Sequence, residues 1–269
     1  MSQWRLIIDN PTTGIQNMAI DSHLLQSVSQ KVMPPTLRIY AWQPMCLSLG
    51  YGQSVRSVDE ERLNARGWQM VRRPTGGLSI LHGDELTYSL SIPIDHPLAK
   101  GDVVTSYRRI SVALLRALQF LGLNPEAEVH PKEDRVYSPV CFETPSHYEI
   151  TVDGRKLLGS AQVRKRDGIL QHGTLPLFGD IGRICEVLAF DDAAARQAAR
   201  DKVYERATTL ESVLGENISW EVMAEAMIKG FEATFDVNCQ QDSLSEDEWM
   251  QVDLIAAEQY ANDNWMYKR

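Results

Sequence analysis

Cys141 is the residue in this sequence that is best suited to covalent chemistry. It lies in Ser138-Pro-Val-Cys-Phe-Glu-Thr-Pro-Ser146, a proline-bounded segment ahead of a predicted strand. A loop cysteine can be exposed to solvent, and exposure near cationic groups favours the reactive thiolate. Cys46 and Cys185 lie instead in apolar stretches, which is typical of packing residues. Cys141 is therefore a candidate nucleophile.

A second candidate element begins at Lys156, which opens the predicted strand 156–162. A lysine at a hairpin edge is usually solvated. The alternative is an ammonium beside a thiol, where it would favour the thiolate and stabilise charge on a reacting carbonyl oxygen. Gly159, Ser160 and Ala161 are small and consecutive in this strand, although glycine weakens a strand unless something approaches its backbone closely. A bound substrate and a tightly packed neighbouring element explain these small residues equally well.

Arg72-Arg-Pro-Thr-Gly-Gly77 is rich in conformationally permissive residues but matches neither of the phosphate-binding patterns GxxxxGK(S/T) and GxGxxG. His82 and His172 are each isolated, and hydrogen-bonded structural histidines are the default interpretation of such residues. His147 and Asp84 form no serine-hydrolase pattern, because the chain has no GxSxG elbow. The residues alone thus indicate an enzyme with a candidate cysteine nucleophile.

The predicted elements indicate an α+β fold, in which clustered strands are flanked by helices without regular βαβ alternation. The clearest local signal is a run of three strands, 147–152, 155–163 and 169–177, joined at Asp153-Gly154 and Asp167-Gly168 turns.

Weaker local signals complete the expected set of elements. Ser57-Val-Asp-Glu60 has the pattern of a capping box, and the helix that it opens is expected to end at Gly67. The chain beyond 177 is expected to be helical, with caps at Ser219 and Ser245. The other expected elements are strands at 4–8, 37–41, 46–49, 68–72 and 86–92, and helices at 15–25 and 104–121.

Composition excludes several classes of protein. The net charge of −9 disfavours nucleic acid as a general partner. No apolar run approaches the roughly 20 residues that span a bilayer, and the first residues lack the pattern of a signal peptide. The four cysteines show no CxxC or paired histidine spacing, which argues against a zinc site or a disulfide framework and favours a reducing cytosol.

Cationic residues nevertheless gather in the middle of this acidic chain. Such a local basic patch suits an acidic macromolecular partner, and a solvated charged face is the equally good alternative. The residues concerned are Arg72, Arg73, Arg155, Lys156, Arg164, Lys165 and Arg166.

Several separated blocks resemble the lipoate–protein ligase A and octanoyltransferase family, whose catalytic domain is similar to that of biotin ligases. These blocks are Arg72–Gly77, His82–Ser89, Lys156–Gln162 and Leu170–Thr174. Cys141-Phe-Glu-Thr-Pro-Ser-His-Tyr-Glu149 is similar to the loop of the LipM-type octanoyltransferases, which use a loop cysteine as acyl acceptor. The resemblance covers nearly the whole chain and implies a mixed sheet flanked by helices. It also implies one catalytic domain over 1–269, with a core at about 31–217 and C-terminal helices 218–269 packed on it.

The resemblance implies an activity as well. An octanoyl group would pass from acyl carrier protein to Cys141 and then to a lysine of a lipoyl domain, the expected acceptor being glycine-cleavage H protein. Lys156 would lower the pKa of the thiol and stabilise the developing oxyanion. No cofactor, metal, nucleic acid or membrane is expected to take part, and the chain is expected to be a cytoplasmic monomer. The implied substrate-binding residues are Arg73, Gly76, Gly77, His82, Ser160, Ala161 and His172.

Three other functions remain as alternatives. The first is an ATP-dependent lipoate ligase; such ligases lack a cysteine in that loop, and Leu78 and Gly83 depart from their pattern in a way that argues against adenylate binding. The second is an amidotransferase that moves octanoyl groups between lipoyl domains, also through a cysteine. The third is a non-catalytic module that binds lipoyl domains and in which Cys141 is inert.

Overall fold

The computed structural model describes residues 1–128 and 149–268, and within them the strands form two sheets. The strands of the larger sheet are β1 (Ser2–Ile8), β2 (Thr36–Tyr40), β6 (Glu85–Pro93), β7 (Glu126–Glu128), β8 (Glu149–Val152), β9 (Arg155–Arg164), β10 (Gly168–Pro176) and β11 (Val237–Asp242). Their order is β11-β1-β2-β6-β10-β9-β8-β7. The pairs among β11, β1 and β2 are parallel, and the pairs from β2 to β7 are antiparallel.

The smaller sheet has the order β4-β3-β5. Its strands are β3 (Cys46–Leu49), β4 (Gln69–Arg72) and β5 (Ile80–His82). The helices of the molecule are α1 (Gly14–Ser29), α2 (Glu60–Ala65), α3 (Val103–Phe120), α4 (Ala193–Arg206), α5 (Leu210–Leu214), α6 (Trp220–Phe235), α7 (Glu246–Ile255) and α8 (Asp263–Met266), with 3-10 turns η1 (Val55–Ser57), η2 (Pro97–Ala99) and η3 (Ile181–Glu186) and the π-turn η4 (Ala256–Tyr260).

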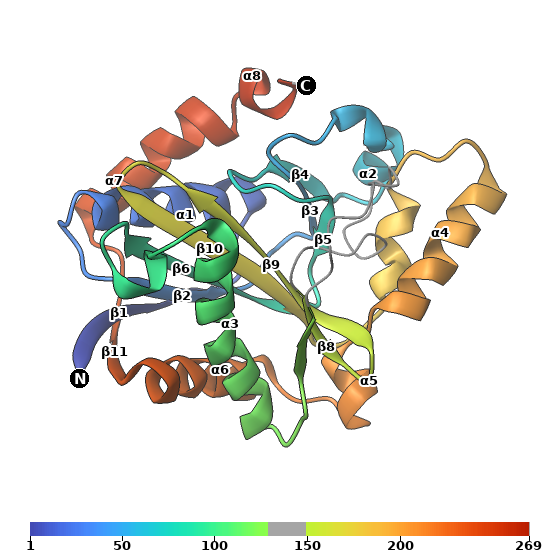
Figure 1. The fold of residues 1–269 in the computed structure, drawn as a ribbon. Helices are drawn as coiled ribbons and strands as arrows, with labels where there is room; N and C mark the ends of the chain where they lie inside the picture. Colours follow the sequence, from blue (N-terminus) through green and yellow to red (C-terminus); the bar gives the residue numbers. More distant parts are fainter. Residues whose placement is uncertain (129–148, 269) are drawn as a thin grey trace.

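Helices cover both faces of the larger sheet. Figure 1 shows α3 and α6 on one face and α1, backed by α7, on the other, with the smaller sheet beside α2 and α4. A mixed sheet flanked by helices confirms the α+β fold that the sequence predicts. In the described part of the chain, no helix is both long enough and apolar enough to cross a membrane.

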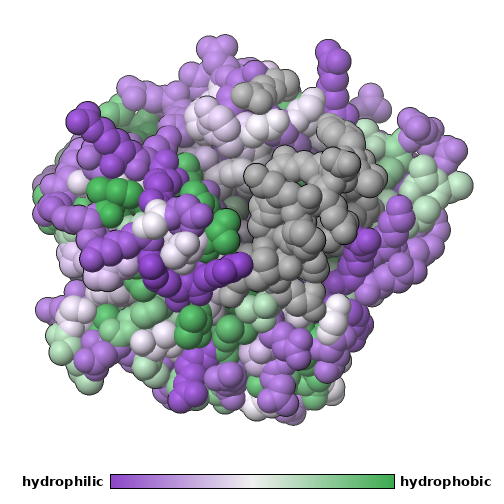
Figure 2. All heavy atoms as spheres, viewed as in Figure 1, coloured by the Kyte–Doolittle hydropathy of each residue, from purple (hydrophilic) through white to green (hydrophobic). Residues whose placement is uncertain are grey.

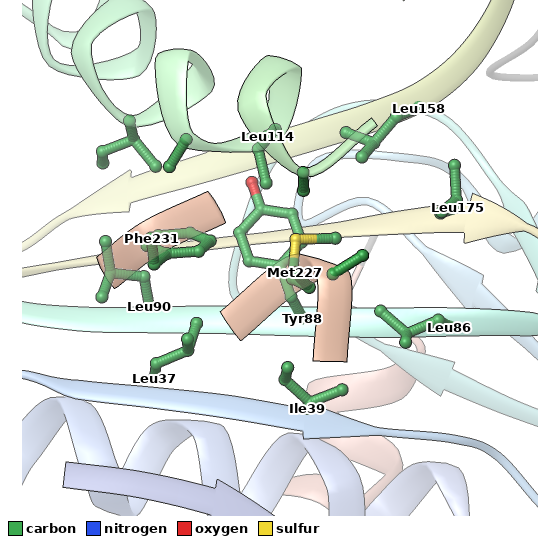
Figure 3. Close-up of a cluster of buried hydrophobic side chains, with 14 of the residues drawn as sticks. Leu37, Ile39, Leu86, Tyr88, Leu90, Leu114, Leu158, Leu175, Met227 and Phe231 are labelled. Carbon is green, nitrogen blue, oxygen red and sulfur yellow. The ribbon is translucent and has the colours of Figure 1, made fainter. Parts of the chain in front are cut away.

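The main core lies between the larger sheet and the α3–α6 layer. Figure 3 shows Tyr88 of β6 between Met227 and Phe231 of α6 and Leu114 of α3, with further leucines from β2, β6, β9 and β10 around it. These side chains alternate along each strand, as a sheet face packed on helices requires. The alternate residues of the same strands, which include Ser89 and His172, face the α1 side of the sheet.

β6 is buried on both faces, since every residue from Glu85 to Ile92 is buried. The polar residues Thr87 and Ser89 face α1, and Ser89 Oγ donates a hydrogen bond to Asp21 at 2.8 Å. α1 is itself buried nearly all round, since it lies between the sheet and α7.

Three local predictions need correction. The N-cap of α2 is Asp59, whose carboxylate accepts the N–H of Arg62, whereas Ser57 belongs to η1. The β9–β10 connection is a loop at 165–167, because Gly168 already lies in β10, where a Cβ would meet Ser29 Oγ at 2.1 Å. The chain beyond 177 is not wholly helical, since β11 pairs in parallel with β1.

Most of the other predictions are confirmed. Asp153 and Gly154 have φ values of 51° and 71°, the type I′ conformation that a two-residue hairpin needs. α3 ends just before Gly122, which has a φ of 79°. Ser219 and Ser245 cap α6 and α7, the latter through a full capping box.

Candidate functional site

A β-bulge in β9 places Lys156 on the α1 side of the sheet. Ile150 pairs with Leu158, but its neighbour Thr151 pairs with Lys156, so Leu157 is an extra residue in β9. Leu157 and Leu158 both enter the main core. Successive side chains of a regular strand alternate, and Lys156 would then share the face of Leu158. The bulge reverses this orientation, which is a common role of bulges next to active sites.

Lys156 consequently shares one sheet face with Gly159. A Cβ built on Gly159 would lie 3.0 Å from Cε and 3.5 Å from Nζ of Lys156. The Nζ atom also forms an ion pair with Glu149 of β8 at 2.6 Å, and both side chains are buried. Glycine at 159 thus leaves the space that the lysine side chain crosses. A tightly packed internal neighbour, one of the two explanations for the small residues, is present here.

The face continues onto β10 through the strand register. Gly159 pairs with Thr174, and Ala161 pairs with His172. Ala161 therefore lies opposite His172 on the same face as Lys156. The Thr174 hydroxyl, which belongs to this face too, is buried and has no hydrogen-bond partner among the described residues.

His172 connects this sheet face to the loop that contains Gly76 and Gly77, which we call the glycine loop. Its Nε2 lies 2.6 Å from Thr75 Oγ1, and its Nδ1 lies 3.2 Å from Asp21 Oδ2. Burial lowers the pKa of His172, and Asp21 offsets this only in part, so the ring is neutral near pH 7. Because the carboxylate must accept, Nδ1 carries the hydrogen, and Nε2 accepts the proton of the Thr75 hydroxyl.

Asp21 is the buried carboxylate that orients His172. It also accepts hydrogen bonds from Tyr40 and Ser89 and forms an ion pair with Arg38 at 3.0 Å. Burial would raise the pKa of Asp21, but the hydrogen bond to His172 and the charge of Arg38 hold it below its usual value. Asp21 is therefore ionised near neutral pH and fixes the His172 tautomer.

A second chain of contacts reaches the same loop from His82. Its Nδ1 hydrogen-bonds to Glu85 Oε1, its Nε2 lies 2.7 Å from Ser48 Oγ, and its ring stacks on Trp42 with centroids 3.9 Å apart. Arg73 Nη1 donates to the backbone carbonyl oxygen of Ser48 at 3.0 Å and to the Ser48 hydroxyl at 3.1 Å. His82 thereby supports Arg73 indirectly, through Ser48.

Arg73 shapes the glycine loop directly. Its Nη2 donates to the carbonyl oxygens of Gly76 and Leu78, each at 2.8 Å. Gly77 has a φ of 95°, which favours glycine, whereas a Cβ on Gly76 would meet no atom of residues 1–128 or 149–268 within 4 Å. As far as the described residues go, the loop is held from behind and is open in front of Gly76, which is the geometry of a backbone wall beside a substrate.

Arg72 connects the start of this loop to the C-terminal segment. Its guanidinium donates to the carbonyl oxygen of Met266 at 2.9 and 2.7 Å and to those of Gly50 and Gln53 at 2.9 and 2.6 Å. Trp265 Nε1 in turn donates to the Arg72 carbonyl at 2.8 Å. The last helix, α8, therefore braces the strand from which the Arg73–Leu78 loop emerges.

The predicted site residues thus fall into groups. One group meets at the glycine loop and consists of Arg73, Gly76, Gly77, His82 and His172. A second group, Lys156 and Ala161, shares the sheet face beside His172. Ser160 is not on that face, because its hydroxyl lies 2.8 Å from Tyr88 Oη on the α3 side of the sheet. Cys141 lies outside the described residues.

The remaining cysteines are poor nucleophiles. Cys46 and Cys185 are fully buried, and burial raises the pKa of the Cys46 thiol well above its usual value. Burial and the charge of Glu232 raise the pKa of Cys239 to about 12. Neither Cys46 nor Cys239 can supply much thiolate near neutral pH.

Sequence reasoning missed Asp21, Thr75 and Glu149 as parts of the site. A signal existed for Asp21, since Asn17 and Asp21 lie four residues apart among apolar residues of the predicted helix, a position that a buried polar cluster would occupy. Glu149 has no comparable signal, because its pairing with Lys156 depends on the bulge. Among the described residues, no group of three or more potential ligands could hold a metal ion.

Comparison with known proteins identifies the family. A profile described as the lipoyl protein ligase A/B catalytic domain matches residues 13–232. The chain belongs to this family. Within the family, it is 36% identical to the octanoyltransferase LipM of Brevibacillus brevis and 38% identical to that of Kyrpidia tusciae, with full coverage of both chains in each case.

Solved structures of the family share the fold. A bipartite lipoate protein ligase from Thermoplasma acidophilum matches with a TM-score of 0.82 at 20% identity, over 98% of this chain and 96% of that one. A lipoate-protein ligase A crystallised with ATP matches with a TM-score of 0.80 at 20% identity, over 98% of both chains. These likenesses extend the family fold to the whole chain, including β11 and the helices after it.

Proposed function

We propose that this protein is an octanoyltransferase of protein lipoylation, which takes an octanoyl group from acyl carrier protein onto Cys141 and passes it to a lysine of a lipoyl domain. The observation that carries the proposal is the full-length similarity to LipM octanoyltransferases at 36% and 38% identity. We propose glycine-cleavage H protein as the acceptor and one cytosolic catalytic domain, acting as a monomer, as the working unit.

Two balanced acyl exchanges make up the reaction. In the first, the Cys141 thiolate attacks the thioester carbonyl of the donor, and the carrier thiolate leaves and takes a proton. In the second, the neutral amine of the acceptor lysine attacks the Cys141 thioester, the thiolate leaves, and the amine loses a proton as the amide forms. The first step exchanges one thioester for another, and the amide is more stable, so ATP is not required.

The proposal gives the site residues distinct roles. Lys156 would favour the Cys141 thiolate and stabilise the oxyanion, and backbone N–H groups near the reacting carbonyl would share that second task. The orientation of Lys156, which the bulge and Glu149 fix, supports this role. Gly76, Gly77 and Ala161 would line the acyl chain, while Arg73, His82 and His172 hold the wall that those glycines form.

The decisive experiment is intact mass spectrometry after incubation with octanoyl-acyl carrier protein in the absence of ATP. We expect one hydroxylamine-labile octanoyl group, mapped to Cys141 by peptide analysis and absent from Cys141→Ser. Addition of an apo lipoyl domain should then discharge the group onto its lysine. An adduct on Cys46, Cys185 or Cys239, or no adduct at all, would contradict the mechanism.

The same experiment separates the rival functions. Transfer that requires free octanoate and ATP would identify a ligase, and loading only from an octanoylated lipoyl domain would identify an amidotransferase. Binding of lipoyl domains without any acyl transfer would identify a non-catalytic module.

A further inference from the structure

The outer side of α3 differs in charge from the rest of the molecule. No carboxylate occurs in its 18 residues, and Arg108, Arg109 and Arg116 are exposed on it. The chain as a whole has a net charge of −9. A cationic helix face on an acidic protein is unusual enough to require an explanation.

The β9–β10 loop extends this cationic surface. Arg164 donates hydrogen bonds to the carbonyl oxygens of Ala99 and Gly101 at 2.6 and 2.8 Å, so the loop at 165–167 lies beside the start of α3. Arg109 donates to the Lys100 carbonyl on the same side. We call the combined surface the α3 basic face: Lys100, Arg108, Arg109, Arg116, Lys165 and Arg166.

Few carboxylates interrupt the α3 basic face. The two in its sequence segments are Asp102 and Asp167. Asp102 caps α3, where its carboxylate accepts the N–H of Thr105 at 2.7 Å. The neighbouring helix α6 differs in sign, with Glu221 and Glu225 on its exposed side. The cationic surface therefore does not extend from α3 onto α6.

Apolar side chains lie between these cations. Val104, Val112 and Phe120 recur every eight residues along α3 and are 37%, 49% and 46% exposed, and Arg116 lies 5.2 Å above the Phe120 ring. Figure 2 shows hydrophobic residues scattered among hydrophilic ones on the side of the molecule where α3 runs. Arginine interleaved with exposed apolar groups on one helix is typical of a protein-binding surface.

The inner side of α3 rests on β9, on the face of the sheet opposite the candidate site. Tyr107 Oη donates to the Ser160 carbonyl at 3.4 Å, and Gln162 Nε2 donates to Ser106 Oγ at 3.2 Å. Ala161, between these two residues, faces the site. A partner seated on α3 would thus lie across the sheet from the acyl-transfer face. Beyond Leu158, β9 pairs only with β10 among the described strands, so a long flexible arm would reach that face around this edge of β9.

We propose that the α3 basic face is the docking surface for the acyl donor, an acidic carrier protein whose octanoyl group is attached through a phosphopantetheine arm. This rests on the proposed function. An amphipathic acidic helix would complement the arginines and valines of α3. The donor also brings a phosphodiester, for which arginine and lysine are natural partners, whereas a lysine acceptor brings no phosphate. The charges therefore favour the donor over the lipoyl domain.

The test is the double charge reversal Arg109→Glu/Arg116→Glu, measured separately in each half-reaction. We expect the KM for octanoyl-acyl carrier protein in the loading step to rise about tenfold or more, with a weaker dependence on salt, because surface charges act mainly on encounter. Loading from octanoyl-N-acetylcysteamine, which has neither carrier nor phosphate, should be unchanged. Discharge from the preloaded enzyme to the lipoyl domain should also be unchanged.

Lys229→Glu, on the acidic surface of α6, is the matched control and should leave the KM for the carrier unaltered. Arg109→Gln/Arg116→Gln, with its melting temperature, provides a milder variant if the reversal disturbs folding. An unchanged KM for the carrier in the double variant overturns the proposal, and so does an effect confined to discharge, which would make this face an acceptor surface. Failure of the wild-type protein to accept octanoyl from the carrier would instead overturn the proposed function.

Discussion

The side chain of Lys156 crosses over Cα of Gly159, so a methyl group at position 159 would lie 3.0 Å from the lysine Cε. The contact is closer than carbon atoms normally approach, and the lysine cannot easily move, because its Nζ is paired with Glu149 at 2.6 Å. Gly159 therefore controls where the ammonium lies.

Gly159→Ala should lower octanoyl transfer by about tenfold while leaving the melting temperature nearly unchanged. An alanine displaces the ammonium, and the accompanying loss of backbone freedom in the unfolded chain offsets part of the strain. The measurement is kcat for transfer alongside thermal unfolding. In a Lys156→Ala background the same change should have no further effect on kcat, since the two residues act as a unit. Additive losses would show that Gly159 acts in some other way.

Variants of Lys156 and Glu149 should distinguish effects on the free energy of unfolding from effects on octanoyl transfer. Lys156→Met leaves a buried carboxylate without its ammonium and should cost about 3 kcal/mol of the free energy of unfolding. Adding Glu149→Gln should restore most of that stability, because the buried charge is removed, but it should not restore activity. Urea unfolding and octanoyl transfer assays on both variants provide the comparison. Recovered activity in the double variant would show that Lys156 is structural only.

Gly76→Ala tests whether the open side of the glycine loop faces the substrate. The new methyl would meet no atom of the described residues within 4 Å, and the backbone of Gly76 does not have a positive φ, so folding should be unaffected. If the acyl chain passes here, the KM for the octanoyl donor should rise several-fold, and shorter acyl groups should be less affected. Equal effects on butanoyl and octanoyl donors would place the acyl chain elsewhere.

A buried ion pair at the start of the chain should give the protein an acid-sensitive component of stability. Arg5 donates to Glu248 at 2.6 and 2.8 Å, and although burial opposes ionisation, the hydrogen bond from Arg5 lowers the pKa of Glu248 to about 2. A carboxyl group with a depressed pKa stabilises the fold above its unfolded pKa of about 4.5, and this contribution disappears as the pH falls towards 2.

Glu248→Gln should accordingly cost about 2 kcal/mol of unfolding free energy at pH 7. The difference between variant and wild type should shrink as the pH is lowered from 5 to about 2, because the wild-type carboxylate becomes protonated. Urea unfolding across that pH range measures it. A difference that stays constant down to pH 2 would mean that the charge of Glu248 is not what stabilises the fold.

Local chemistry in the sequence predicted the hairpin that carries Lys156. Asp153-Gly154 determines a type I′ turn, and its two strands follow from that turn and from their own residues. The glycine block Arg72–Gly77 and the isolated histidines were also recognisable as separate pieces. Residue types and short spacings contain this information because turns and caps depend on a few adjacent residues.

Long-range geometry could not be obtained in the same way. The bulge at Leu157 depends on how β8 and β9 pair, and simple alternation would have directed Lys156 into the core. Asp167-Gly168 resembled a second tight turn, but Gly168 is small because α1 packs against it. The convergence of His82 and His172 on one loop likewise arises from contacts between elements far apart in the chain.

β1 and β11 pair from Ser2 with Val237 to Ile7 with Asp242. A ribosome makes β1 long before β11, so one edge of β1 remains open while residues 9–236 are made. An open edge can recruit strands of other nascent chains. The same delay applies to the glycine loop, whose brace by Met266 through Arg72 emerges even later. The β1 edge and the glycine loop therefore both depend on segments that are made much later, and a chain truncated before β11 lacks the pairing of the first and the brace of the second.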